Sequence, residues 1–250
     1  MTIYTVQRGD TLYGIARKFG VSVRDITDLN SLSNVNRLMI GQALVIPTEV
    51  LPSILVNGYA YPTISDTTLA LTLPSLTFIS IFSYQVTSNG NLTPISDSRV
   101  IRAAKDNNTL PMLVMTNIGS TGRFDSDLAH DILSNEAVQE RLISNLITTL
   151  RNKGYAGVDI DFEYVYPMDK ELYNAFLEKV VTRLHEEDFI VTTALAPKVR
   201  EDQPGTLYEA HDYVTHGRLA DHVIIMTYEW GYTYGPPMAV APINQVERVI

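Results

Sequence analysis

Apolar and acidic residues alternate strictly along residues 157–163. The alternate positions carry either an apolar side chain (Val158, Ile160, Phe162) or a carboxyl group (Asp159, Asp161, Glu163). Successive side chains of a strand point to opposite faces, so the pattern predicts a strand with three carboxyl groups on one face, spaced about 6.6 Å apart. Carboxylates this close in a low-dielectric site cannot all stay ionised, and at least one is expected to hold a proton.

An edge strand with a solvated acidic face is the alternative interpretation of this segment. Three features favour a buried strand instead. The segment enters through Gly157 and Val158 and carries large or β-branched apolar side chains. A helical pattern over residues 169–187 follows directly, as in a βα unit. A solvated face would also usually mix Lys, Thr or Ser among its acids, and this one does not.

The first fifty residues predict a separate small module. Strand patterns at 4–6 and 43–46 enclose helical patterns at 12–19 and 23–30. Asp10 or Thr11 can cap the first helix, Gly20 can end it, and Ser22 can cap the second. The expected order is therefore strand, helix, helix, strand over residues 1–48, followed by a short linker at 49–53 that contains Pro52.

From residue 54 onward, strand and helix patterns alternate. Strands are expected at 54–61, 77–84, 112–116, 157–163, 190–195 and 222–227, and helices at 96–107, 127–134, 136–153, 169–187, 212–217 and 242–250. Repeated βα units with nearly continuous apolar strands predict a parallel sheet covered by helices. This pattern is compatible with both a doubly wound sheet and a (β/α)₈ barrel.

Two observations favour the barrel. No glycine-rich phosphate loop follows the first strand. Polar and aromatic residues gather where strands end, which in a barrel is the catalytic face: Tyr59, Tyr84, Asn117, Glu163, Tyr228 and Trp230. A full barrel needs eight strands and about 250 residues of its own. The prediction is therefore a TIM-type barrel over residues 54–250 that is truncated after strand six.

Composition and net charge limit the classes of molecule that the chain is expected to bind. The 250 residues carry a net charge of −9, which argues against nucleic acid and against an anionic membrane surface but not against a carbohydrate. The chain has no cysteine, so disulfides, thiolate metal sites and a cysteine nucleophile are excluded. The five histidines show no ligand spacing, so neither a metal nor a cofactor is expected. No segment has 18 consecutive apolar residues, and the N-terminus lacks a signal-peptide pattern.

The N-terminal module resembles the LysM family. The resemblance rests on the segments Tyr-Thr-Val-Gln-Arg-Gly-Asp-Thr-Leu at 4–12 and Gly-Gln-Ala-Leu-Val-Ile-Pro at 41–47, together with Ile15-Ala16 and Leu29-Asn30. LysM modules bind glycans that contain N-acetylglucosamine, in peptidoglycan or chitin. The resemblance places the binding groove on two loops, at Gly9, Asp10, Thr11 and Leu12 and at Met39, Ile40 and Gly41.

The acidic segment resembles the signature of the family-eighteen glycoside hydrolases, the chitinase-like barrels. Asp159, Asp161 and Glu163 match the last three acids of Asp-Gly-x-Asp-x-Asp-x-Glu, and Ala156 stands where the first Asp is expected. Met226-Thr227-Tyr228 matches the motif of strand six, with Glu229 where the family usually has Asp or Asn. The missing first Asp is remote from the sugar in the family, so it is expected to tune the chemistry rather than abolish it.

The resemblance implies a substrate-assisted, retaining mechanism, an exception among glycosidases. Glu163 would be the general acid, Asp161 would orient the substrate's acetamido group, Asp159 would share a proton with Asp161, and Tyr228 would donate to the acetamido oxygen. Tyr59, Asn117, Glu229 and Trp230 are further candidate sugar contacts, since aromatic residues at a barrel mouth stack on pyranose faces, although such residues also cap cores.

A LysM module joined to this barrel resembles the bacterial spore-germination N-acetylglucosaminidases, which usually carry two LysM repeats where one is visible here. The resemblance implies hydrolysis of N-acetylglucosaminyl bonds in peptidoglycan, most specifically spore cortex, by a protein associated with the spore coat, cortex or cell wall. Two alternatives remain: a chitinase acting on chitin oligomers, and a non-catalytic glycan-binding protein. Lectin-like relatives usually lose the acid, and Glu163 is retained. The oligomeric state is not predicted.

Overall fold

The computed structural model describes residues 2–32, 34, 37–47, 54–231 and 234–250. The chain divides into two compact units, Met1–Ile54 and Leu55–Ile250. Each unit has a hydrophobic core of its own. The expected linker at 49–53 lies outside the described residues.

The N-terminal unit has the predicted strand–helix–helix–strand order. Strands β1 (Thr2–Thr5) and β2 (Ala43–Ile46) pair antiparallel, and helices α1 (Leu12–Phe19) and α2 (Val23–Leu29) pack against them. Thr11 caps α1 through its hydroxyl, and Ser22 forms a capping box with Asp25 at the start of α2. Gly20 ends α1 with φ 70°, the left-handed conformation that glycine adopts most readily.

The larger unit contains a parallel sheet in sequential order, β3-β4-β5-β6-β7-β8. Its strands are β3 (Asn57–Ala60), β4 (Phe78–Gln85), β5 (Leu110–Thr116), β6 (Gly157–Asp161), β7 (Ile190–Leu195) and β8 (His222–Ile225). The six expected barrel strands are thus confirmed. Gly157 is required where β6 meets β7, because a Cβ at this position would lie 2.0 Å from the carbonyl oxygen of Ile190.

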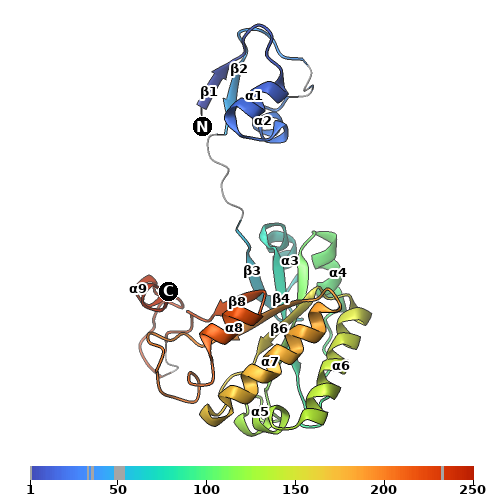
Figure 1. Cartoon of the computed structure of the whole chain (residues 1–250), viewed down its shortest axis with the longest axis vertical. Coiled ribbons are helices and arrows are strands. Elements are labelled where there is room, and N and C mark those ends of the chain that lie inside the picture. Colours follow the sequence, from blue (N-terminus) through green and yellow to red (C-terminus); the bar gives the residue numbers. More distant parts are fainter. Residues whose placement is uncertain (1, 33, 35–36, 48–53, 232–233) are drawn as a thin grey trace. The chain divides into compact units, whose positions relative to one another are not determined.

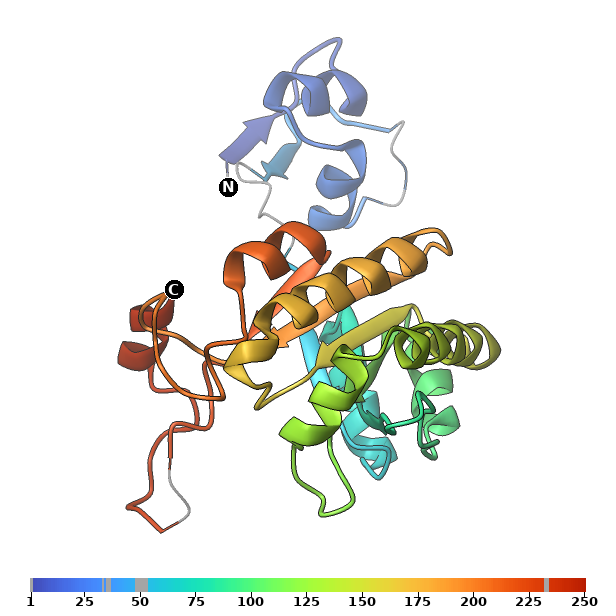
Figure 2. The same ribbon diagram turned by 60° about the horizontal axis from the view of Figure 1, so that its bottom comes forward.

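Helices flank the sheet on its outer face (Figures 1 and 2). They are α3 (Asp66–Thr72), α4 (Ser98–Asp106), α5 (Ser126–Leu133), α6 (Glu136–Lys153), α7 (Lys170–His185) and α8 (Tyr213–Leu219), with short 3₁₀ turns η1 (Leu73–Ser75) and η2 (Pro167–Asp169). Helix α9 (Ile243–Val249) stands apart from the sheet (Figure 1) and has no buried residue. The predicted bounds of α1, α6, β2 and β7 are those observed, and the other predicted helices differ from the structure by one or two residues at their ends. Helix α3 was not predicted.

The sheet is curled, because side chains from strands that are not neighbours in the sheet contact each other. Phe162 stacks on Tyr173 and Phe176 of α7, with ring centroids 6.0 Å apart in both pairs, so the apolar face of β6 is turned toward the helices. The acidic face is turned to the inside of the curl. There the hydroxyl of Tyr59, on β3, reaches Asp159 on β6, although two strands separate them in the sheet.

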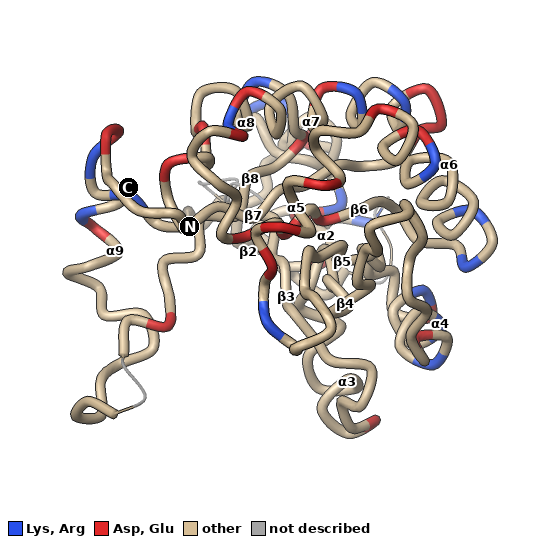
Figure 3. The backbone as a smooth tube through the Cα atoms, turned by 90° about the horizontal axis from the view of Figure 1, so that it is seen from below, with Lys and Arg blue, Asp and Glu red and all other residues tan. Residues whose placement is uncertain are grey.

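Charged residues lie mainly on the outside of this unit. Acidic and basic positions are interspersed along α6 and α7, whereas β3, β4 and β5 carry few of either sign (Figure 3). None of the described helices combines the length and the apolarity that crossing a membrane requires.

Candidate active site

The three acids meet at the carboxyl end of β6, but not all of them belong to the strand. Asp159 and Asp161 lie within the β-ladder, with exposed fractions of 0% and 4%. The strand was expected to run to residue 163 and ends instead at Asp161. Glu163 therefore stands beyond the last ladder position, and the next residue, Tyr164, has a left-handed backbone with φ 53°. A non-glycine residue with positive φ is uncommon and is often found at functional sites.

Asp159 is held from the opposite side of the curl. The hydroxyl of Tyr59 donates to Asp159 Oδ2 at 2.5 Å. Burial raises the pKa of Asp159, and the hydroxyls of Tyr59, Thr192 and Ser80 offset only part of that effect. Tyr59 was predicted as a sugar contact. The structure places its hydroxyl on Asp159 while its ring lines a cavity.

Asp161 has the least favourable surroundings for a negative charge. Burial raises the pKa of its carboxyl well above the ordinary value, and the charges of Glu163 and Asp159 add to this effect. Among the described residues, Oδ1 of Asp161 and Oδ1 of Asp159 are buried and have no hydrogen-bond donor. At least one of these carboxyls is therefore expected to hold a proton, as the spacing predicts.

Glu163 has the electrostatics of a general acid. Burial raises its pKa to about 7, with a further contribution from the charge of Glu229. Glu229 follows β8 and has φ 61°, a second positive value at this edge of the sheet. A carboxyl group with a pKa near neutrality can donate a proton at physiological pH and take one back.

Two adjoining cavities open beside Glu163. They share Glu163, Met226, Tyr228 and Glu229 as lining residues. The first measures about 300 Å³ and is lined by aromatic side chains and Asp161 (Tyr59, Tyr61, Phe82, Phe124). The second measures about 430 Å³ and has a more polar wall (Gln203, Tyr208, Trp230, Arg248). Glu163 thus faces both spaces, as an acid between two sugar rings of a glycan would.

Tyr228 and Trp230 also lie at this mouth. Burial raises the pKa of the Tyr228 hydroxyl to about 12, with Asp161 as the next contribution, so Tyr228 stays a hydrogen-bond donor at neutral pH. The indole Nε1 of Trp230 is buried and has no acceptor among the described residues. Both residues line the larger cavity, and Tyr228 also lines the smaller one.

Asn117, another predicted sugar contact, lies beneath the site. Its side chain is 0% exposed, and it bonds to main-chain groups of Glu163 and Asp125. Both amide hydrogens are used in these bonds, so the side chain has no donor left for a ligand.

Val6, three residues before the first predicted loop of the N-terminal unit, bonds to Gly41 and Gln42 at the end of the second. Met39 and Ile40 expose about 70% of their surface, at 69% and 70%. Gly9 and Gly41 have φ values of 92° and 85°. Leu12 is buried in the core, Thr11 caps α1, and Asp10 accepts bonds from Tyr4 and Gln7.

Comparison with known proteins identifies the families of the two units. Residues 4–47 match the LysM domain, and residues 59–245 match the glycosyl hydrolases family 18. The chain belongs to glycosyl hydrolase family 18. It is 38% identical to the cortical fragment-lytic enzyme of Bacillus subtilis (strain 168), over all of this chain and 70% of that protein.

Solved structures of similar proteins have the same fold. The spore cortex-lytic enzyme SleL of Bacillus cereus superposes with a TM-score of 0.76 at 36% identity, over 99% of this chain and 58% of that one. A chitinase from Chromobacterium violaceum ATCC 12472 gives a TM-score of 0.71 at 19% identity, over 78% of this chain and 63% of the chitinase. This chain thus spans less than two thirds of the solved chains that it matches.

One buried residue of this family 18 site was not singled out from the sequence. His211 contacts the main chain next to Glu163, whereas the sequence showed only that the histidines have no ligand spacing. No periodic signal marks it, because it lies in a loop between β7 and α8. Within the described residues, no group of three or more His, Asp or Glu side chains is arranged to hold a metal ion.

Proposed function

We propose that this chain hydrolyses N-acetylglucosaminyl bonds of a glycan with retention of configuration, through assistance by the substrate's own acetamido group. One observation supports this most strongly: Asp159, Asp161 and Glu163 gather at the end of β6, and Glu163 has a pKa of about 7 beside two cavities. Family 18 is among the families in which the substrate replaces the enzyme carboxylate as nucleophile.

Each residue then has a chemical task. Glu163 protonates the leaving oxygen while the acetamido oxygen attacks the anomeric carbon, which gives an oxazolinium ion. Asp161 orients the acetamido N–H and stabilises the positive charge, and Asp159 exchanges a proton with Asp161. Tyr228 donates to the acetamido oxygen. Glu163 then removes a proton from the water that opens the oxazolinium ion, and the original configuration returns.

The proposed substrate is peptidoglycan, most specifically that of the spore cortex. The similarity to cortical fragment-lytic and spore cortex-lytic enzymes supports this choice over chitin. The LysM module would bind the same polymer through the two predicted loops and raise the local substrate concentration for the barrel. The proposed location is accordingly the spore cortex or cell wall.

Purified full chain and its Glu163→Gln variant test the proposal on cortex muropeptides and on chitin oligomers. We expect the wild type to cleave muropeptides with retention, and the variant to lose about 10²–10⁴-fold in kcat. Cleavage of chitin alone would contradict the cortex substrate. A wild type that binds both glycans and cleaves neither would contradict hydrolysis and indicate a glycan-binding protein.

The pH dependence provides a second test. Because Glu163 must be protonated to donate, kcat/KM is expected to fall as pH rises through about 7. A profile that stays flat up to pH 9 would show that Glu163 is not the acid.

A further inference from the structure

The peptide unit that joins Phe162 to Glu163 is held by side chains, although it directly continues a strand. In a parallel ladder, alternate residues of one strand bond to a given neighbour. The bond from the Ile190 N–H to the Ala156 carbonyl, with the register Ile160↔Thr193, sets that alternation between β6 and β7. If the ladder continued beyond its last residue pair with the same alternation, the Phe162 carbonyl would accept a hydrogen bond directly from the Ala196 N–H.

His211 occupies the place of that bond. Its Nε2 lies 2.9 Å from the Phe162 carbonyl oxygen, and its Nδ1 accepts from the Ala196 N–H at 2.8 Å. Because Nδ1 accepts, the proton of the neutral ring is on Nε2 and is donated to Phe162. Burial lowers the pKa of His211 to about 4, so the ring stays in this neutral form near pH 7. The imidazole thus separates β6 from β7 at their carboxyl ends by the width of a ring.

Asn117 makes the equivalent substitution on the β5 side. In the register Thr116↔Asp161, the Glu163 N–H would donate to the main-chain carbonyl of Asn117. That carbonyl accepts from the Asp125 N–H at 3.0 Å instead. The Asn117 side chain replaces it: Oδ1 accepts from the Glu163 N–H, and Nδ2 donates to the Glu163 carbonyl, both at 2.9 Å.

We propose that Asn117 and His211 are positioning residues for the catalytic acid, which together hold the Phe162–Glu163 peptide where β6 parts from both neighbouring strands. For Asn117, this positioning role replaces the predicted role of sugar contact. The two side chains leave Glu163 free to face both cavities while its backbone stays fixed. The inference rests on the proposed function only in treating Glu163 as the acid.

Matched variants separate positioning from general stability. His216 is also buried, its ring centroid is 6.4 Å from that of His211, and its Nδ1 bonds to Thr193 rather than to the main chain next to Glu163. Asn174 is a buried asparagine on α7 that bonds to Asp212. His216→Ala and Asn174→Ala are therefore the controls for His211→Ala and Asn117→Ala.

We expect His211→Ala and Asn117→Ala to lower kcat about 10–100-fold at nearly constant KM, because small displacements of a catalytic group have effects of this size. Both controls should keep the wild-type kcat per folded molecule. His211→Gln, which carries a donor and an acceptor on one amide, should recover part of the loss. Asn117→Asp, which turns carboxylate oxygens toward two carbonyls, should not recover it.

An NMR titration of Glu163 tests the same inference without activity. The pKa of Glu163 should fall toward the ordinary value of about 4.3 in the His211 and Asn117 variants and stay near the wild-type value in the controls. If all four alanine variants lower kcat and the Glu163 pKa alike, positioning is contradicted. If His211→Ala does not fold, His211→Gln and Asn117→Asp decide the question. A wild type without hydrolase activity would contradict the proposed function alone. The titration would still test whether Asn117 and His211 position Glu163.

Discussion

Asp97 and Asp159 are both 0% exposed, and a tyrosine hydroxyl donates to each at 2.5 Å. Asp97 lies just before α4, between the sheet and its helices, and it also accepts from Tyr155 at 2.6 Å and from Lys153 at 2.5 Å. Asp159 lies inside the curl of the sheet, and its other oxygen has no donor among the described residues.

The difference in partners reverses the effect on the pKa. Burial raises the pKa of both groups, but at Asp97 the bonds from Lys153, Tyr155 and Tyr84 outweigh burial and leave the pKa below its ordinary value. At Asp159 burial prevails and the pKa is raised. A buried carboxylate whose oxygens accept enough hydrogen bonds stabilises the fold, whereas one that lacks these donors stays ready to take up a proton.

The largest expected effect is the loss of activity at the unsatisfied carboxyls. Asp161→Asn removes the negative charge that would stabilise the oxazolinium ion, so we expect kcat to fall about 10³-fold, equivalent to about 4 kcal/mol in the barrier. The thermal midpoint should stay equal or rise, because a carboxyl with a strongly raised pKa destabilises the fold at neutral pH. If Asp161→Asn lost activity only as far as it lost folded protein, Asp161 would not differ from Asp97 in its role.

Asp97→Asn should give the opposite result. The substitution leaves Lys153, which is 28% exposed, without its charged partner. We expect the free energy of unfolding to fall by about 3 kcal/mol. The kcat of the folded fraction should remain at the wild-type value. Urea unfolding and a kinetic assay on the same sample check both parts, and a fall in kcat at unchanged stability would contradict the structural role of Asp97.

Glu163→Gln should stabilise the fold in a pH-dependent way. The folded pKa of about 7 lies above the ordinary unfolded value of about 4.3, so the wild type loses stability as pH rises between these values. Glutamine does not titrate. The variant should therefore equal the wild type near pH 4 and exceed it by about 3–4 kcal/mol above pH 7. Urea unfolding at pH 4.5 and pH 7.5 measures the difference, and an equal gain at both pH values would contradict the raised pKa.

The comparison also shows what the sequence could predict. Six strands, six of the seven helices that the structure describes in the larger unit, and the three acids follow from periodicity and from the family signature. Helix α3 was missed because three of its seven residues are threonines, which have low helix propensity, and the Ser65 cap supports it locally.

Contacts between distant segments were beyond local patterns. The bond from Tyr59 to Asp159 requires the curl of the sheet, and the end of β6 at Asp161 depends on His211, a residue 49 positions from Phe162. Asn117 was assigned to the substrate because strand ends carry functional residues in barrels. Its burial depends on the turn that sends its main-chain carbonyl to Asp125. These features arise from tertiary packing and have no periodic signature.

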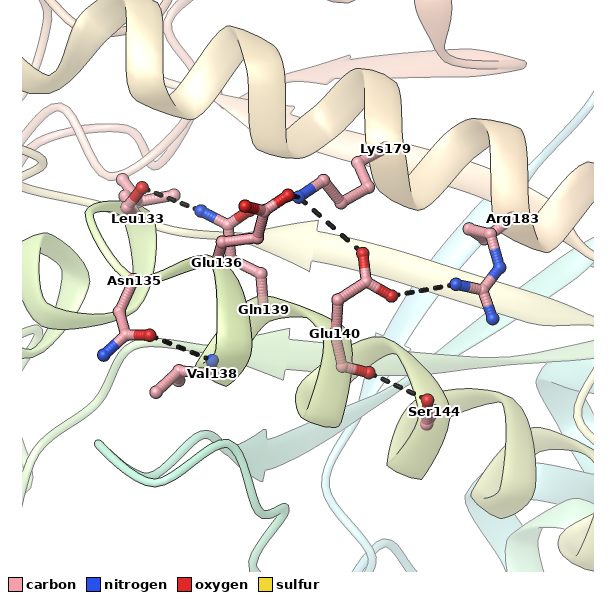
Figure 4. A network of polar contacts seen from close by, with 9 residues as sticks. All are labelled: Leu133, Asn135, Glu136, Val138, Gln139, Glu140, Ser144, Lys179 and Arg183. Carbon is pink, nitrogen blue, oxygen red and sulfur yellow. Dashed lines mark hydrogen bonds and ion pairs between the residues drawn. The ribbon is translucent and has the colours of Figure 1, made fainter.

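The smallest expected effect comes from the ion pairs between α6 and α7 (Figure 4). Arg183 bonds to Glu140 at 3.0 Å, and the Glu140 side chain is 47% exposed. Exposed pairs contribute little because water and salt screen them, so Glu140→Gln should change the free energy of unfolding by less than about 0.5 kcal/mol.

The neighbouring Gln139 provides the internal contrast. It is 7% exposed, donates to the Leu133 carbonyl at 2.7 Å and accepts from Lys179 at 3.1 Å. Gln139→Ala leaves the buried Leu133 carbonyl without this donor and should reduce stability by about 1–2 kcal/mol. Urea unfolding of both variants at low and high salt measures the two effects. A larger effect of Glu140→Gln would contradict the view that hydrogen bonding of buried groups explains why Asp97 contributes more to stability than the exposed ion pairs.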